Sequence, residues 1–213
     1  MVVAGGLPSA TTRSAVAFAQ SNQEYPMTDE EFLALNSIYL RKIASARVVE
    51  ECTSLLMATI ETVLSAAQEV GELFDVGDGQ CMLSDEGTQA VLREYAARYA
   101  VQRTDGTVAE WYQRFEVLNG QFLTNISAWQ QDGDGDTGRL DRLLRLVERQ
   151  IKALPSISGH VGRYDIYRGR FERALERVDQ GQSDYVVSPN VDSIHNIWFE
   201  FHEDILTLLG RPR

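Results

Sequence analysis

The feature that most constrains the fold of this chain is a stretch of apolar residues spaced three or four positions apart, over residues 27–73. This stretch contains no proline and no glycine before Gly71. Such spacing places the apolar side chains along one face of an α-helix. Thr28 and Glu31 match the Thr-x-x-Glu pattern, in which two reciprocal hydrogen bonds close a helix N-terminus. The sequence therefore predicts a long amphipathic helix from Thr28, with a kink or a break near residues 45–47.

The rest of the chain repeats this periodicity in shorter segments that are separated by turn-forming residues. Helices are expected over residues 84–103, 107–129, 139–154, 161–180 and 190–209. Pro155 and Gly210 are expected to end two of them, and Ser188 or Asn190 to cap the last. No segment shows sustained period-two alternation, so no strand is predicted. The expected fold is all-α: an antiparallel bundle of five or six helices around the long N-terminal helix, in one domain over residues 27–213.

Residues 1–26 differ in composition from the predicted domain. They are rich in Gly, Ser, Thr and Ala, with one arginine and no acid before Glu24. A disordered arm is expected, with an organelle-targeting segment as the alternative. The two cysteines, Cys52 and Cys81, are too few for a disulfide scaffold, and no apolar run approaches the roughly 20 residues of a membrane span. A soluble intracellular protein, most simply cytoplasmic, fits these observations.

The net charge of −11 argues against nucleic-acid binding, which usually requires a basic face. Residues 134–178 are the exception, with 10 basic and 7 acidic residues. Their arginines recur at three- and four-residue steps in two rows, Arg139, Arg142, Arg145 and Arg149, then Arg170, Arg173 and Arg177. Each row shares one flank of a predicted helix, where it can bind an acidic partner protein. Pairing with acids of the same chain, or simple solvation, is the alternative.

The segment 73–86 lies between two predicted helices and contains acidic residues at loop spacing. With Asp75 at the first position, Met82 falls on the eighth and Glu86 on the twelfth, and in this respect the segment resembles a calcium-binding loop of the EF-hand family. The resemblance implies calcium ligation by Asp75 and Glu86. Positions three and five, which should supply oxygen ligands, are Gly77 and Gly79. The departure puts tight calcium binding in doubt, and no cofactor is expected.

A second acidic loop, over residues 132–138, presents Asp132, Asp134 and Asp136 at alternate positions. Carboxylates at this spacing can collect a hard cation. The twelfth position from Asp132 is Leu143, where a bidentate acid is required, so the loop is an incomplete calcium site. Acids that complement the dipole of the following helix are the alternative interpretation.

No residue pattern indicates a catalytic site. The three histidines lack metal-ligand spacing, and no nucleophile motif or glycine-rich phosphate loop is present. Phe199 points away from the apolar row that contains Trp198 and Phe201, so it is either buried between two layers or exposed as an anchor for a partner.

These observations predict a non-enzymatic interaction or assembly protein, such as an accessory subunit or adaptor. It would dock on protein partners, or on a second copy of itself, through amphipathic helix faces. The alternative is a cation-responsive helical protein built on the acidic loops at 75–86 and 132–138, and an unfamiliar helical enzyme ranks third.

Overall fold

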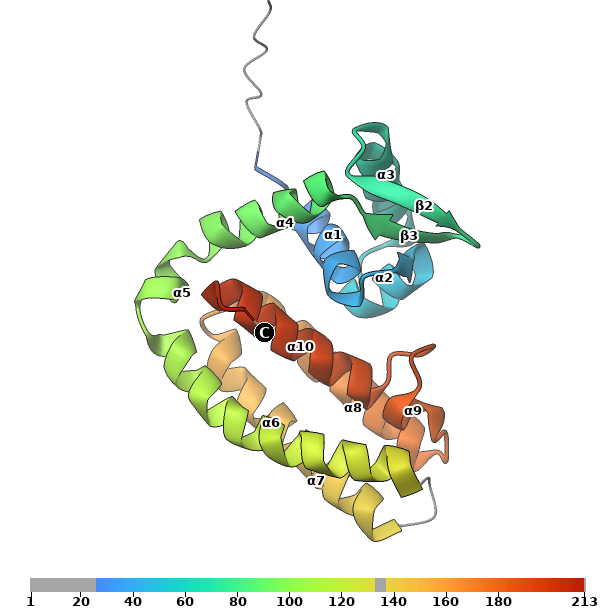
Figure 1. The fold of residues 1–213 in the computed structure, drawn as a ribbon, viewed down its shortest axis with the longest axis vertical. Helices are drawn as coiled ribbons and strands as arrows, with labels where there is room; N and C mark the ends of the chain where they lie inside the picture. Colours follow the sequence, from blue (N-terminus) through green and yellow to red (C-terminus); the bar gives the residue numbers. More distant parts are fainter. Residues whose placement is uncertain (1–25, 133–136, 213) are drawn as a thin grey trace, which may run out of the picture.

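A computed structural model describes residues 26–132 and 137–212, and within them the chain is predominantly helical (Figure 1). In chain order the elements are α1 (Asp29–Arg41), β1 (Ala44–Ser45), α2 (Ala46–Thr53), α3 (Met57–Glu69), β2 (Leu73–Gly77), β3 (Gln80–Leu83), α4 (Asp85–Arg98), α5 (Ala100–Thr104), α6 (Thr107–Asp132), α7 (Thr137–Ser158), the 3₁₀ turn η2 (Gly162–Tyr164), α8 (Asp165–Asp179), α9 (Asp184–Val187) and α10 (Ile194–Leu209). The mostly helical class is therefore confirmed, whereas the described residues form ten helices and three strands in place of the expected five or six helices. None of the helices described is long and apolar enough to cross a membrane.

The long N-terminal helix is wrong, because residues 27–73 form three helices and part of a sheet. The capping box of Thr28 and Glu31 begins α1 as predicted. Lys42 then adopts a φ of 71° and ends that helix. Ser45 accepts a hydrogen bond from the N–H of Val48 and starts α2, close to the break anticipated at residues 45–47. Ser54, with a φ of 61°, ends α2. Both terminating residues adopt a backbone conformation that L-residues rarely occupy, so neither helix end could be predicted from the sequence.

The absence of strands is the second wrong prediction. Three antiparallel strands form a sheet in the order β1-β3-β2. Gly77, Asp78 and Gly79 all have positive φ and turn the chain between β2 and β3. The segment that resembles a calcium loop is therefore a β-hairpin followed directly by α4. Its strands are only five and four residues long, and β2 has no regular alternation of buried and exposed residues, so neither strand stands out beside the helical pattern before it.

Several predicted boundaries also shift. Pro155 lies inside α7, which continues to Ser158 rather than stopping. The helix expected over residues 84–103 breaks at Tyr99 into α4 and α5. The N-cap of α10 is Ser193, not Ser188 or Asn190, while Gly210 ends that helix in the left-handed conformation as expected. The predictions for residues 1–25 lie outside the described part of the chain.

Helix α10 occupies the centre of the fold, in contact with α1 and α4 on one side and with α6 and α8 on the other (Figure 1). Its aromatic side chains form the core. The ring of Trp198 stacks on Phe122 at 3.9 Å between centroids, and Phe201 packs edge-to-face against rings from α6 and α8. Full burial of a side chain of this size contributes about 2–3 kcal/mol to stability. Any polar residue on the inner face of α10 is therefore surrounded by four other helices.

Candidate functional site

Two acidic residues interrupt the apolar inner face of α10, one turn apart. Glu200 is 5% exposed and Asp204 is completely buried. A buried carboxylate is costly unless it is paired and hydrogen-bonded. The partners of these two side chains therefore determine what the interior of the protein can do chemically.

Asp204 is the acceptor at the centre of the first cluster. The guanidinium of Arg163 donates to both carboxylate oxygens. Three tyrosine hydroxyls also converge on Asp204, from Tyr95 at 3.0 Å, Tyr164 at 3.3 Å and Tyr167 at 2.7 Å. We call Asp204, Arg163 and these three tyrosines the Asp204 cluster. The hydroxyl of Tyr95 also lies 2.7 Å from Asn36 Oδ1, so its one proton is shared between two acceptors. The other four donor contacts already engage the carboxylate of Asp204, so it is not available as a general base.

The electrostatics of the Asp204 cluster keep its phenols protonated. Burial, followed by the negative charge of Asp204, raises the pKa of Tyr95, Tyr164 and Tyr167 well above the ordinary value. The cationic group of Arg163 also lies 4.9 Å from the ring centre of Tyr164 and 5.3 Å from that of Tyr95, within the range of cation–π attraction. The cluster joins α4 to α8 and α10 across the middle of the fold.

A second cluster lies next to it and is balanced in charge. Arg170 Nη2 is 2.6 Å from both Asp192 Oδ1 and Glu200 Oε2. Arg41 contacts the same two acids, at 2.8 Å from Asp192 Oδ1 and 2.7 Å from Glu200 Oε1. Burial would raise the pKa of Asp192, but Arg170 and Arg41 outweigh it and the net shift is downward. We call these four residues the Arg170 cluster, and it ties α1 to α8 and α10.

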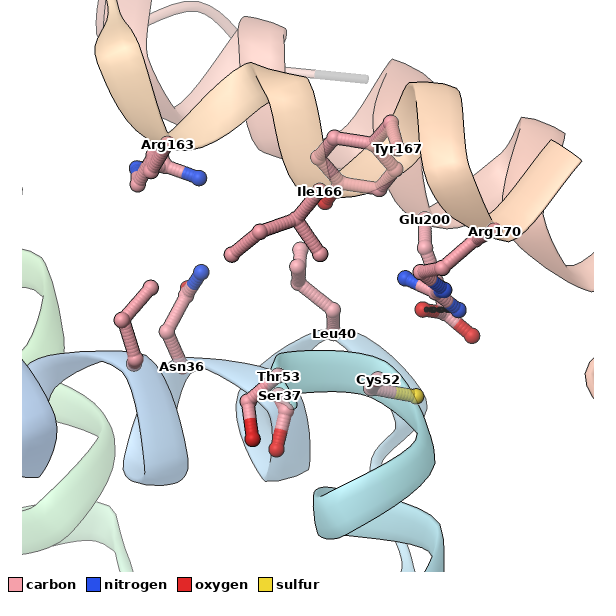
Figure 2. Close-up of a pocket in the computed structure, with 11 residues that line it drawn as sticks. Asn36, Ser37, Leu40, Cys52, Thr53, Arg163, Ile166, Tyr167, Arg170 and Glu200 are labelled. Carbon is pink, nitrogen blue, oxygen red and sulfur yellow. Dashed lines mark hydrogen bonds and ion pairs between the residues drawn. The ribbon is translucent and has the colours of Figure 1, made fainter. Parts of the chain in front are cut away.

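Between the two clusters lies a pocket of about 30 Å³ (Figure 2). Figure 2 shows Arg163, Tyr167 and Arg170 on one side of it and Cys52 on the other, from α2. The volume accommodates about two water molecules, far less than the roughly 300 Å³ or more of a typical ligand pocket. Burial raises the pKa of Cys52 to about 12, so the thiol stays protonated and is a poor nucleophile.

Phe199 lines a larger surface pocket of about 290 Å³ at the C-terminal end of α1. Its ring lies 4.5 Å from that of His195, and the side chain is half-buried against the core. Burial lowers the pKa of His195, which is therefore neutral at pH 7. His202 lies elsewhere, with Nε2 3.0 Å from the hydroxyl of Tyr112. Phe199 is thus neither fully buried nor fully exposed, and the histidines do not form one site.

The two arginine rows have different environments. On α7, Arg142, Arg145 and Arg149 are exposed, and Arg139 donates to the carbonyl of Ala128. On α8 the row is divided: Arg170 is buried in its cluster, Arg173 donates to the carbonyl of Glu51, and Arg177 lies over the ring of Tyr185. The internal pairing weighed as an alternative holds for Arg170, whereas Arg173 and Arg177 on α8 are exposed, as are Arg142, Arg145 and Arg149 on α7.

The predicted calcium ligands are not gathered around a common point in the described structure. The carboxylate of Asp75 accepts a hydrogen bond of 2.7 Å from the N–H of Gly77 within the hairpin, and Glu86 is exposed in the first turn of α4. Across residues 26–132 and 137–212, no group of three His, Cys, Asp or Glu side chains is placed to hold a metal ion. Asp134 and Asp136 lie outside these residues, as does the side chain of Asp132.

The sequence did not reveal the apolar outer face of the hairpin. Phe74, Val76 and Met82 are 53%, 45% and 38% exposed, and Phe74 is paired with Met82 across the two strands. Leu73 and Leu83, which point to the opposite side, are buried. We call the three exposed side chains the hairpin face. Phe74 fitted the helical spacing of the preceding residues, which is why its position on a strand was missed.

The charge around the hairpin face is one-sided. Residues 48–92 contain nine acidic residues and no Lys, Arg or His. Five of these acids lie in the hairpin or next to it in the chain and form no ion pair with any described residue: Glu69, Asp75, Asp78, Asp85 and Glu86. We call them the acidic flank. The hairpin thus presents apolar side chains within an acidic surface that the chain itself does not neutralise.

No protein-family model, no curated protein and no solved structure matches this chain. Its function must therefore be inferred from its own interior and surface.

Proposed function

We propose that this chain is a non-enzymatic interaction protein that docks on a partner protein through the hairpin face. The observation that carries the proposal is the exposure of Phe74, Val76 and Met82 on a hairpin that buries Leu73, Cys81 and Leu83. Burial of apolar surface against a partner is favourable by about 25 cal/mol for each Å² removed from water. Groups of exposed apolar side chains mark contact surfaces more often than isolated ones do.

The interior supports the same proposal. The charged groups of the Asp204 and Arg170 clusters bind one another, and the pocket between them is too small for an organic substrate. Groups arranged in this way stabilise the contact between helices and present no reactive atom to a ligand. A binding protein needs such a rigid interior, since a preorganised surface loses less entropy when it binds.

The chemistry of the partner follows from the acidic flank. A partner that covers the hairpin face brings its own charges close to Asp75 and Asp78, where acidic groups would be repelled and basic groups attracted. A second copy of the chain can supply basic groups through the α7 row of Arg142, Arg145 and Arg149. Light scattering of the pure protein distinguishes a separate partner protein from a second copy of the chain. We expect a monomer, whereas a chain that docks on itself would form oligomers.

Site-specific photo-crosslinking in the source cells tests the proposal. A photoreactive residue is placed at Met82 in one version and at Val117 in another. Val117 is the control because it is also exposed, at 65%, but lies on α6. We expect one protein to be captured from position 82 and not from position 117.

The captured protein is then purified and its affinity measured. Phe74→Ser should weaken binding at least tenfold, whereas Val117→Ser should leave it unchanged. Equal crosslinking from both positions, or unchanged affinity for Phe74→Ser, would show that the hairpin face is not the docking surface.

A further inference from the structure

The outward side of α7 carries four basic residues in a row. All are exposed and follow one another at steps of three, four and three residues: Arg142, Arg145, Arg149 and Lys152. We call them the basic ridge. At 3.6 residues per turn, the four side chains lie within an arc of about 80° on the helix, and at 1.5 Å per residue the ridge is about 15 Å long. It is therefore a continuous strip of positive charge.

The described structure does not neutralise the basic ridge. None of its four members forms an ion pair with a described residue. Arg149 donates to the neutral amide oxygen of Gln121 at 3.0 Å, which shows that α6 lies beside the ridge. Residues 117–131 of α6 contain no Asp, Glu, Lys, Arg or His. The helix next to the ridge therefore supplies no counter-charge.

The acids of α7 lie to one side of the basic ridge. Helix geometry places Asp141 and Glu148, both exposed, outside the arc of the ridge and on the side away from Gln121. A charged face that meets only solvent usually mixes the two signs, as α8 does where Arg168 pairs with Glu172 at 2.9 Å. On α7 the signs are separated and no such pair forms, so the ridge is suited to an acidic group from outside the chain.

The spacing of the basic ridge fits an acidic helix better than an extended acidic segment. Steps of three and four residues along α7 are about 4.5 and 6 Å long, and a helix lying alongside repeats the same steps. Alternate residues of an extended strand are about 6.6 Å apart, so three steps would overrun the ridge by about 5 Å. The order three, four, three reads the same in both directions, so a parallel or an antiparallel helix fits.

A nucleic acid is a poorer occupant. Its phosphates continue well beyond a ridge of about 15 Å, and a chain with a net charge of −11 would repel them there. A short acidic segment of a protein places its charge on the ridge alone.

We propose that the basic ridge is a second docking surface, which binds a helical segment of another protein with acidic residues at three- and four-residue steps. Figure 1 shows α7 at the lower end of the molecule, whereas β2 and β3 lie at the upper end. The inference goes beyond docking at the hairpin face. The chain joins two partners of opposite charge, a basic one at the hairpin and an acidic one at α7.

The test uses the full chain and a terminally blocked, alanine-rich helical peptide with four Glu at steps of three, four and three residues. Exposed ion pairs are individually weak, so binding is followed by NMR titration at low ionic strength, through the Nε–Hε resonances of the arginines. We expect the resonances of Arg142, Arg145 and Arg149 to shift together to saturation, and added salt to reverse the shifts. A peptide of the same composition whose four Glu point to different sides of the helix should bind at least fivefold more weakly.

Two double variants with the same net charge separate the ridge from the overall charge of the protein. Arg142→Gln with Arg145→Gln removes two charges from the ridge. Arg47→Gln with Arg168→Gln removes two from α2 and α8, where the side chains are 82% and 50% exposed. The first double variant should bind the acidic peptide at least fivefold more weakly, and the second should lose less than twofold. Circular dichroism should be unchanged for both, because all four side chains are exposed.

The outcomes distinguish this inference from docking at the hairpin. Phe74→Ser should leave binding of the acidic peptide unchanged. Absence of shifts at the ridge, equal binding of the two peptides, or equal losses in the two double variants would overturn the acidic-helix site, and crosslinking from position 82 would still stand. Tighter binding of a short RNA duplex to the ridge would overturn the choice of a protein partner. Oligomers of the pure chain that dissociate in the Arg142→Gln and Arg145→Gln double variant would overturn the choice of a separate protein over a second copy.

Discussion

Replacing Asp204 with asparagine should destabilise this protein more than any conservative change on its surface. The substitution preserves size and one carbonyl oxygen, but it removes the charge that balances Arg163. It also turns an NH₂ group toward some of the donors that now converge on the carboxylate. The variant therefore combines an uncompensated buried cation with opposed donors.

The magnitude follows from the burial of the pair. The side chains of Arg163 and Asp204 are 10% and 0% exposed. Removing one partner of a buried pair typically costs about 3–5 kcal/mol, out of a total stability of about 5–15 kcal/mol for a domain. At about 2–4 °C for each kcal/mol in a chain of this size, Asp204→Asn should lower the melting temperature by about 6–20 °C.

Urea unfolding followed by tryptophan fluorescence measures the loss, and a second variant tests its cause. Arg163→Met combined with Asp204→Asn removes the orphaned cation, so the double variant should lose less stability than the two single variants together, with a coupling energy of about 1.5–3 kcal/mol. A loss below about 1 kcal/mol for Asp204→Asn, or losses that simply add, would refute the interpretation of this cluster as a structural tie.

Three further predictions concern buried groups. Both amide atoms of Gln150, which is fully buried, lack a hydrogen-bond partner in the structure, so Gln150→Leu should stabilise the protein by about 1–3 kcal/mol in urea unfolding, and a destabilised variant would contradict this. The three tyrosines of the Asp204 cluster have raised pKa values in the folded protein. The stability that this shift contributes is therefore fully present below the pKa of tyrosine in the unfolded chain, and it is lost as the pH rises from that value through the folded-state pKa. Their absorbance at 295 nm should therefore appear only with cooperative unfolding, and ionisation in the folded state would count against it. The pKa of Asp192 is lowered in the folded protein, so its contribution to the free energy of unfolding is present above the ordinary value of 3.8 and is lost as the pH falls through the folded-state pKa. Asp192→Asn should therefore lower the free energy of unfolding more at pH 7 than at pH 3, and an equal loss at both would argue against the pairing.

The sequence predicts well the elements whose periodicity and end signals agree. The segment 107–129 begins after the Asp105-Gly106 turn and carries a continuous aromatic row, and α6 extends over it. Gly210 ends α10 as expected. The breaks at Lys42 and Ser54 were not predicted, because a non-glycine residue with positive φ is stabilised by tertiary contacts and has no local signature.

The hairpin and the buried clusters show two other limits of the sequence. The glycines around Asp78 suit either a metal loop or a tight turn, and the sequence cannot separate these roles. Asp204 and Arg163 are 41 positions apart, so their pairing could not be read from spacing. One signal was present: Asp204 follows Phe201 by three positions and precedes Leu208 by four, which places an acid in the buried row of the last helix.

The distribution of charge separates the roles of the two halves. Eighteen of the 20 basic residues are arginine, and Arg163 and Arg170 each reach several acceptors at once, which the single ammonium of a lysine does less well. These arginines neutralise acids inside the fold, whereas residues 48–92 contain nine acids and no Lys, Arg or His of their own. Acids that served only solubility would not need to be concentrated there. The dipole of α4 accounts for Asp85 and Glu86 in its first turn but not for Asp75 and Asp78 in the hairpin. A basic partner at the hairpin accounts for all four carboxylates and for the apolar side chains among them.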